Sequence, residues 1–114
     1  MGEDGKIDYV EFPSGGDLTA TKRFYTQAFG WEFTDYGPGY SAFDEGLDGG
    51  FNGDPADQAR APLVILYADD LVAMEAKVRA AGGEITRAPY DFPGGRRFHF
   101  RDPGGNELAV WAET

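Results

Sequence analysis

The sequence contains no cysteine, only one histidine and no long apolar run. The absence of cysteine excludes disulfide bonds, thiolate nucleophiles and thiolate metal ligands, and it is typical of a reducing compartment. The longest apolar stretch, 63–68, is far shorter than the roughly 20 residues that a membrane-spanning helix needs. The N-terminus is polar and acidic, unlike a signal peptide. The sequence therefore predicts a cytoplasmic protein with no membrane partner.

Basic residues are also scarce, since 10 lysines and arginines face 20 acidic residues and give a formal charge of −10. A nucleic-acid-binding protein needs a cationic surface, whereas this one repels phosphate on average. We therefore expect no nucleic-acid partner. Arg96, Arg97 and Arg101 form one local basic group that offers a bidentate clamp for a small anion, unless these side chains only offset nearby acids.

The length of 114 residues fits a single domain over 1–114, which buries enough surface to fold without a disulfide or a metal. The 17 glycines indicate many turns and short strands rather than long helices. The chain therefore has room for one core built mainly from short elements.

Two parts of the chain carry the same order of structural signals. The first part has a strand over 6–12, a helix capped by Asp17 and ended by Gly30, and short strands over 31–36, 40–44 and 49–52. The second part has a strand over 63–68, a helix capped by Asp69-Asp70 and ended by Gly82-Gly83, a strand over 84–88, and a hairpin over 96–111. The matching order predicts two βαβββ modules, one over about 6–53 and one over about 62–112, joined by a polar connector.

The C-terminal hairpin combines a dense turn signal with the only histidine. Two alternating runs flank Asp102-Pro103-Gly104-Gly105-Asn106. His99 shares a face with Arg97 and Arg101, so one interpretation is a general base or a hydrogen-bond donor to a ligand. The structural alternative is a half-exposed strand residue.

Period-2 alternation assigns the strand side chains to two faces. One face is predicted to pack on the helices: Val10, Phe12, Val64, Leu66, Leu108 and Val110. The other is predicted to be concave, apolar and aromatic: Tyr9, Glu11, Leu63, Ile65, Tyr67, Glu107, Ala109 and Trp111. Such a face is typical of a small-molecule pocket.

Several residues of the concave face are candidates for chemistry or binding. Glu11 and Glu107 are candidate catalytic residues, because a carboxylate in an apolar pocket can act as an acid or a base. Pairing of Glu11 with an arginine is the structural alternative. Three apolar residues are candidates for a floor under an aromatic ligand, or else belong to the core or a dimer interface: Ile65, Tyr67 and Trp111.

The chain also resembles a known family. Phe24-Tyr25 followed by Phe29-Gly30-Trp31 resembles the first-helix signature of the vicinal oxygen chelate superfamily, which includes glyoxalases, extradiol dioxygenases and bleomycin-resistance proteins. The turn 102–106 and the second-helix signals at 69–71 and 82–83 resemble the same group. The likeness is nearest to small bacterial glyoxalase-like proteins. It implies an α+β fold with a cupped mixed sheet, and a homodimer.

Metal-dependent members of this superfamily place His or Glu at four strand positions. Here these positions fall on Tyr9, near Gly50, on Leu63 and on Ala109. A divalent metal needs about three to four nitrogen or oxygen donors, so the resemblance implies that this chain binds no metal and uses no cofactor. Because Tyr9 stands at a vacated ligand position, it is the residue most expected to touch a ligand.

Three functions remain open at this stage. The first is a metal-independent protein that holds a small aromatic or anionic organic molecule in the cup, through Tyr9, Ile65, Tyr67, Arg97 and Trp111. The second is a lyase or isomerase of the lactoylglutathione-lyase kind, with Glu11, Glu107 or His99 as its base. The third is a structural dimer whose cup is filled by side chains. The sequence does not decide whether the protein is an enzyme.

Overall fold

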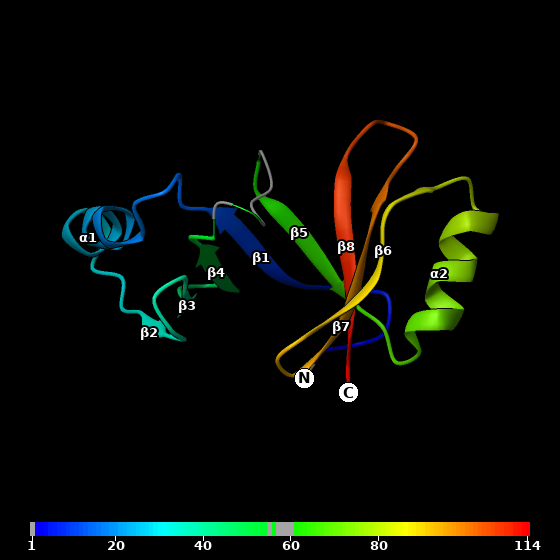
Figure 1. The fold of residues 1–114 in the computed structure, drawn as a ribbon, viewed down its shortest axis with the longest axis horizontal. Helices are drawn as coiled ribbons and strands as arrows, with labels where there is room; N and C mark the ends of the chain where they lie inside the picture. The colour runs from blue at the N-terminus through cyan, green and yellow to red at the C-terminus, as the bar shows by residue number, and fades with distance from the viewer. Residues whose placement is uncertain (1, 55, 57–60) are drawn as a thin grey trace. The chain divides into compact units, whose positions relative to one another are not determined.

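The computed structural model describes residues 2–54, 56 and 61–114. The chain divides into two compact units. We call Tyr9–Leu63 the N-unit, and the described residues of Met1–Asp8 with Val64–Thr114 the C-unit. Each unit has the predicted order βαβββ, which confirms the α+β fold class (Figure 1). Residues 55 and 57–60 of the predicted connector lie outside the described residues.

The N-unit is a four-stranded sheet with one helix. Its elements are β1 (Ile7–Pro13), of which Tyr9–Pro13 belong to this unit, α1 (Leu18–Phe29), β2 (Thr34–Asp35), β3 (Tyr40–Asp44) and β4 (Asp48–Asn52). β4 pairs in parallel with β1 and antiparallel with β3, and β3 pairs antiparallel with β2. The predicted strand over 31–36 shortens to β2, because only Thr34 and Asp35 pair with β3.

The predicted signals fix both ends of α1. The Asp17 side chain accepts a hydrogen bond from the Ala20 amide at 2.9 Å, which satisfies one free amide of the first turn. Gly30 adopts the left-handed conformation with φ of 75°, and its amide donates to the Thr26 carbonyl. The cap and the stop predicted from the sequence are therefore confirmed.

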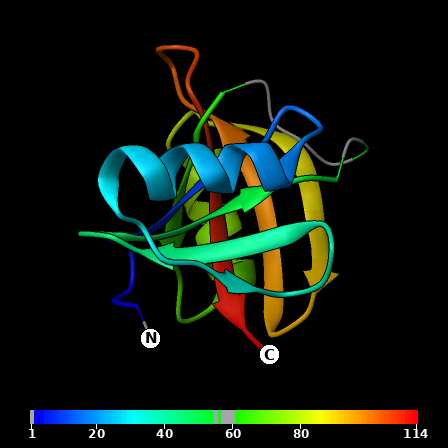
Figure 2. The same ribbon diagram turned by 90° about the vertical axis from the view of Figure 1, so that its left-hand side faces the viewer.

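The core of the N-unit is aromatic. Phe12, Phe43 and Phe51 come from the strand face that packs on α1, and Tyr25 of α1 lies 5.1 Å from Phe51 between ring centroids. Trp31 stacks on Tyr25 at 4.7 Å. Figure 2 shows α1 lying across these strands. The other face of the sheet, which carries Tyr9 and Glu11, is left for the candidate site.

The C-unit repeats the same plan. Its elements are β5 (Leu63–Tyr67, with Leu63 in the N-unit), α2 (Leu71–Ala80), β6 (Glu84–Phe92), β7 (Gly95–Arg101) and β8 (Glu107–Glu113). β8 pairs in parallel with β5 and antiparallel with β7, and β7 pairs antiparallel with β6. Asp70 caps α2 by accepting from the Ala73 amide at 3.1 Å.

The core of the C-unit lies between α2 and one face of its strands. Five buried residues form it, with Leu66 and Met74 packed against them: Ala68, Leu71, Phe98, Val110 and Ala112. Leu66 and Val110 therefore face α2, as their alternation predicts. Ile65, Ala109 and Trp111 alternate with them, so these residues lie on the opposite face.

One strand is longer than predicted. β6 continues to Phe92 and forms a hairpin with β7, with Gly94 at a φ of 98° in the turn. The prediction ended this strand at Ala88, but the strand continues through Pro89, although proline is normally excluded from the middle of a sheet. β6 lies at the end of the strand order of the C-unit and carries irregular register, so it tolerates the proline. In the described part of the chain, no helix is long and apolar enough to cross a membrane.

Candidate functional site

Three polar side chains of the N-unit form a hydrogen-bonded chain on the face away from α1. The hydroxyls of Tyr9 and Tyr40 lie 2.7 Å apart, and the Tyr40 hydroxyl donates to Glu11 Oε1 at 3.1 Å. Because Tyr40 has one hydroxyl proton and gives it to Glu11, Tyr9 must donate its own proton to Tyr40. Glu11 is only 7% exposed, so the chain ends on a buried carboxylate.

Gly50 leaves the space that the hydrogen-bonded side chains occupy. Glu11 and Ala42 both lie opposite Gly50 in the paired strands. A Cβ atom at Gly50 would lie 2.6 Å from Cε1 of the Tyr40 ring, far inside van der Waals contact. Tyr40 can therefore extend over β4 to reach Glu11 on β1 only because residue 50 has no side chain.

The phenols of Tyr9 and Tyr40 both have raised pKa values. Burial raises the pKa of Tyr9 to about 12; the negative charges of Glu11 and Asp48 also raise it, while the hydrogen bond with Tyr40 lowers it. Burial, followed by the charge of Glu11, raises the pKa of Tyr40 further. At neutral pH both hydroxyls are protonated, and the direction of the hydrogen-bonded chain is fixed.

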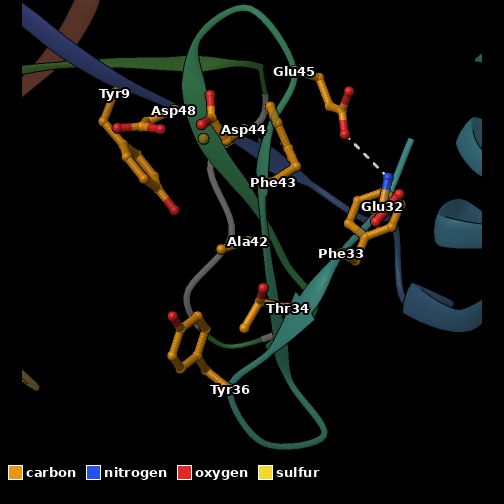
Figure 3. Close-up of a pocket in the computed structure, with 11 residues that line it drawn as sticks. Tyr9, Glu32, Phe33, Thr34, Tyr36, Ala42, Phe43, Asp44, Glu45 and Asp48 are labelled. Carbon is orange, nitrogen blue, oxygen red and sulfur yellow. Dashed lines mark hydrogen bonds between the residues drawn. The ribbon is translucent and has the colours of Figure 1, made fainter. Parts of the chain in front are cut away.

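Tyr9 also lines a pocket of about 580 Å³ in the N-unit (Figure 3). Four of the lining residues are aromatic and four are acidic: Tyr9, Phe33, Tyr36 and Phe43; Glu32, Asp44, Glu45 and Asp48. Thr34, Ala42 and Gly49 complete the lining, so no lysine, arginine or histidine from the described ranges contributes to it. The pocket is acidic and aromatic, which disfavours an anion inside it.

The structure gives the acidic groups different surroundings. The Glu45 carboxylate accepts the Glu32 amide at 3.1 Å, the dashed contact in Figure 3. Asp44 and Asp48 stand opposite each other across the β3–β4 ladder. Figure 3 shows Tyr9, Asp44 and Asp48 near one another at one end of the pocket, and Phe33 with Glu32 at the other.

A second polar network lies in the C-unit. Arg97 Nε donates to the Tyr90 hydroxyl in a short hydrogen bond, and that hydroxyl lies 2.8 Å from His99 Nε2. His99 Nδ1 lies 3.6 Å from Glu107 Oε2, which also accepts from the Thr86 hydroxyl at 2.9 Å. Arg97 and His99 are 8% and 7% exposed, so the middle of this network is buried.

The surroundings of His99 favour one tautomer. Glu107 Oε2 lies 3.6 Å from Nδ1, beyond hydrogen-bond length, and a carboxylate there favours a proton on that nitrogen. With Nδ1 protonated, Nε2 of the neutral ring accepts from the Tyr90 hydroxyl. The order Glu107, His99, Tyr90 is one in which a carboxylate orients an imidazole and the imidazole can take the phenol proton.

The other predicted ligand residues belong to the C-unit, where Tyr67 and Trp111 contact each other and Ile65 is buried. Ile65 and Tyr67 are 2% and 7% exposed, and the rings of Tyr67 and Trp111 pack edge-on at 5.2 Å. Trp111 Nε1 donates to Asp8 Oδ2 at 2.8 Å, and the Tyr67 hydroxyl donates to Glu113. These contacts hold Tyr67 and Trp111 within this unit.

The three arginines do not form a common clamp. Arg96 pairs with Asp91 at 2.8 Å and Arg101 pairs with Glu84 at 3.2 Å, both in exposed positions. Arg97 alternates with Arg96 along β7 and so lies on the other face, with Tyr90. The predicted bidentate site is therefore not assembled from all three.

The residues at the family's metal positions do not fit a metal ion. Tyr9 is a neutral phenol that donates its proton to Tyr40, so it presents no phenolate to a metal, and the Tyr40 ring fills the space beside Gly50. Leu63 and Ala109 are buried and carry no donor atom. Within residues 2–54, 56 and 61–114, no three His, Asp or Glu side chains are grouped to hold a metal.

Two residues that sequence reasoning missed complete these networks. Tyr40 was placed on a strand, but its contact with Glu11 depends on the missing side chain of Gly50, a non-local relationship. Tyr90 lies beyond the predicted end of its strand. The alternation of β3 with β4 offers one usable signal, because it places Tyr40 on the same face as Gly50.

Comparison with known proteins establishes the family. Residues 6–110 match the Glyoxalase/Bleomycin resistance protein/Dioxygenase superfamily, so the chain belongs to this superfamily. The resemblance predicted from the helix and turn signals is confirmed.

Individual relatives add detail. The chain is 34% identical over 117 residues to the anthracycline biosynthesis protein DnrV of Streptomyces peucetius, covering 83% of this chain but 42% of DnrV. It therefore spans less than half the length of that relative. It is 25% identical to the Mn(II)-bound glyoxalase from Novosphingobium aromaticivorans, with a TM-score of 0.65 over 98% of this chain and 40% of that one. A structure of NAD-dependent benzaldehyde dehydrogenase from Legionella pneumophila has a TM-score of 0.77 at 14% identity, over 93% and 98% of the two chains, which shows the shared fold alone.

Proposed function

We propose that the protein binds a small organic molecule in the pocket of the N-unit without the help of a metal ion. The observation that carries the proposal is the hydrogen-bonded series from Tyr9 through Tyr40 to buried Glu11, because its first member, Tyr9, lines this pocket. A binding site needs a few placed polar groups among apolar ones, and the chain places one such group. The sequence predicted an aromatic or an anionic ligand. Because the pocket is acidic, we propose an aromatic ligand and not an anionic one.

Two further points support this proposal. Tyr9 and Tyr40 are held by each other before any ligand arrives, and such preorganisation reduces the entropy lost on binding. DnrV is named as an anthracycline biosynthesis protein, which favours a ligand from small-molecule biosynthesis. The aromatic side chains Phe33 and Tyr36 line the same pocket as Tyr9 and offer stacking surface there.

A fragment screen by two-dimensional NMR tests the proposal. The isotope-labelled protein is first dialysed against a chelator and then mixed with aromatic fragments that are acidic, neutral or basic. We expect fragments to shift the amide signals of the pocket, and Tyr9→Phe to weaken them. Binding that needs added metal, or a full library that leaves the pocket signals unmoved, contradicts the proposal. The second result favours a structural dimer instead.

The network of the C-unit favours a second candidate function. Glu107, His99 and Tyr90 form an acid–base series that fits a glyoxalase-like lyase or isomerase. Glu11 fits this role less well, because its carboxylate already accepts a hydrogen bond from Tyr40. An assay with methylglyoxal and glutathione tests this candidate, with and without nickel or zinc. Turnover that is lost in His99→Asn supports it; no turnover in either condition contradicts it.

The homodimer and the cytoplasmic location remain proposals from the family resemblance. Sedimentation equilibrium measures the first directly. A mass near 12.4 kDa at high protein concentration indicates a monomer, and twice that mass indicates the dimer.

A further inference from the structure

We propose that the pocket of the N-unit selects a cationic aromatic amine, with its ammonium group held between Tyr9, Asp44 and Asp48. This inference rests on the proposed function and names the chemical class of its ligand. It is carried by a repulsive carboxylate pair, by the direction of the Tyr9 hydrogen bond and by the aromatic lining.

Asp44 and Asp48 are cross-strand partners in the β3–β4 hairpin. Like charges directly opposite each other in an antiparallel pair destabilise a sheet. Neither carboxylate has an ion pair with a lysine or arginine in the part of the chain that the structure describes. The hairpin therefore carries a repulsion that a bound cation would relieve, and the pair lines the pocket in which that cation would sit.

The polarity of Tyr9 points to the same ligand. The Tyr9 hydroxyl donates its hydrogen bond to Tyr40, because the Tyr40 hydroxyl donates its own to Glu11. The Tyr9 oxygen can therefore only accept a hydrogen bond from a molecule in the pocket. An ammonium group brings the donors that this oxygen and the two carboxylates need, whereas a carboxylate or a phosphate brings none.

The rest of the lining fits the body of such a molecule. Phe33 and Tyr36 provide aromatic surface, on which a ring can stack and over which an ammonium is attracted. The formal charge of −10 on the whole chain also favours the approach of a cation over that of an anion.

A matched series of probes tests the inference. We use 2-naphthylmethylamine, 2-naphthylmethanol and 2-naphthoate at neutral pH, which differ mainly in charge and in hydrogen-bond donors. Affinity is measured by NMR titration of the pocket amide signals. We expect the amine to bind about tenfold more tightly than the alcohol, as for one close charge contact, and the acid to bind least. Added salt should weaken only the binding of the amine.

Asp48→Asn separates the carboxylate from the shape of the pocket. This variant should lower the affinity for the amine about tenfold, leave that for the alcohol unchanged, and raise the melting temperature of the free protein, because it removes the repulsion with Asp44. Glu3→Gln is the control, since it removes one negative charge from the C-unit, outside the pocket lining. It should change neither affinity.

The possible results distinguish the two proposals. Pocket binding in which the alcohol or the acid equals the amine overturns the inference and leaves the proposed function standing. An Asp48→Asn variant that binds the amine as well as the parent protein also overturns the inference. If neither these probes nor the fragment library shifts the pocket signals, the proposed function falls, and the inference falls with it.

Discussion

The Tyr9 hydroxyl lies 2.7 Å from the Tyr40 hydroxyl. The direction of this hydrogen bond is set by Glu11, which accepts the hydrogen bond that Tyr40 donates. Glu11 Oε1 accepts a hydrogen bond from the Tyr40 hydroxyl, so the Tyr40 oxygen accepts one from the Tyr9 hydroxyl. A group outside the pocket thereby determines what the pocket surface of Tyr9 can bind.

Replacing Tyr40 tests how much the hydrogen bonds among Tyr9, Tyr40 and Glu11 contribute to stability. Tyr40→Phe removes the donor to Glu11 and leaves a buried acceptor with one hydrogen bond fewer, so we expect a loss of about 1–3 kcal/mol in the free energy of unfolding. Urea denaturation measures it. Tyr36→Phe is the matched control, because Tyr36 is 67% exposed and should change stability by less than about 0.5 kcal/mol. Equal losses of stability in the two variants would contradict a stabilising hydrogen bond from Tyr40 to Glu11.

Gly50→Ala tests the space beneath the Tyr40 ring. The new methyl group would overlap the ring, so we expect a loss of about 1–3 kcal/mol in stability, together with weaker ligand binding as Tyr40 moves. Thermal unfolding and the NMR titration measure the two effects. Gly39→Ala is the control, because a Cβ there meets nothing within 4 Å. A Gly50→Ala protein as stable as this control would show that the ring is not held there.

The raised pKa of Tyr9 predicts a dependence on alkaline pH. The pKa is about 12 in the folded protein against an ordinary value of 10.0, so the unfolded chain loses this proton first. The contribution of Tyr9 to the free energy of unfolding should thus be constant below pH 10 and should fall between pH 10 and about 12. Absorbance near 295 nm follows the tyrosines as they ionise. Tyr9→Phe should remove a late step, and loss of an early step instead would contradict the assignment.

The lone histidine makes the network of the C-unit directly measurable. In protein labelled with ¹⁵N-histidine, only His99 contributes to the ring signals. We expect the neutral ring to carry its proton on Nδ1, facing Glu107, and Glu107→Gln to reduce that preference. Thr86→Val is a control that removes the other hydrogen bond to Glu107 while leaving its charge in place. A neutral ring protonated on Nε2 would contradict the network.

Local signals predicted much of the fold. Asp17 and Gly30 fix the ends of α1 through backbone groups within one turn, so they can be recognised without the rest of the chain. Period-2 alternation assigned Tyr9 and Glu11 to one face and Phe12 to the other, because that alternation is a property of each strand by itself.

The contacts within the site needed information from further along the chain. Tyr40 reaches Glu11 across a strand that happens to have a glycine at the crossing point, and no local pattern encodes that contact. Tyr90 was missed because the predicted strand ended at Ala88, whereas β6 continues through Pro89 to Phe92 at the edge of the sheet, where proline is tolerated. Arg96, Arg97 and Arg101 look like one cluster in the sequence, but Arg96 and Arg101 pair with different acidic residues, and Arg97 lies on the opposite face of β7 from Arg96.

The most direct test of metal-free binding in the N-unit compares the parent protein with Tyr9→Phe. Both are treated with a chelator and titrated with 2-naphthylmethylamine by NMR. The account predicts that the amine shifts the pocket signals of the parent without any metal, and that Tyr9→Phe weakens this binding about tenfold through loss of one acceptor for a charged donor. Equal binding by the two proteins, or binding that appears only when a divalent metal is restored, would contradict it.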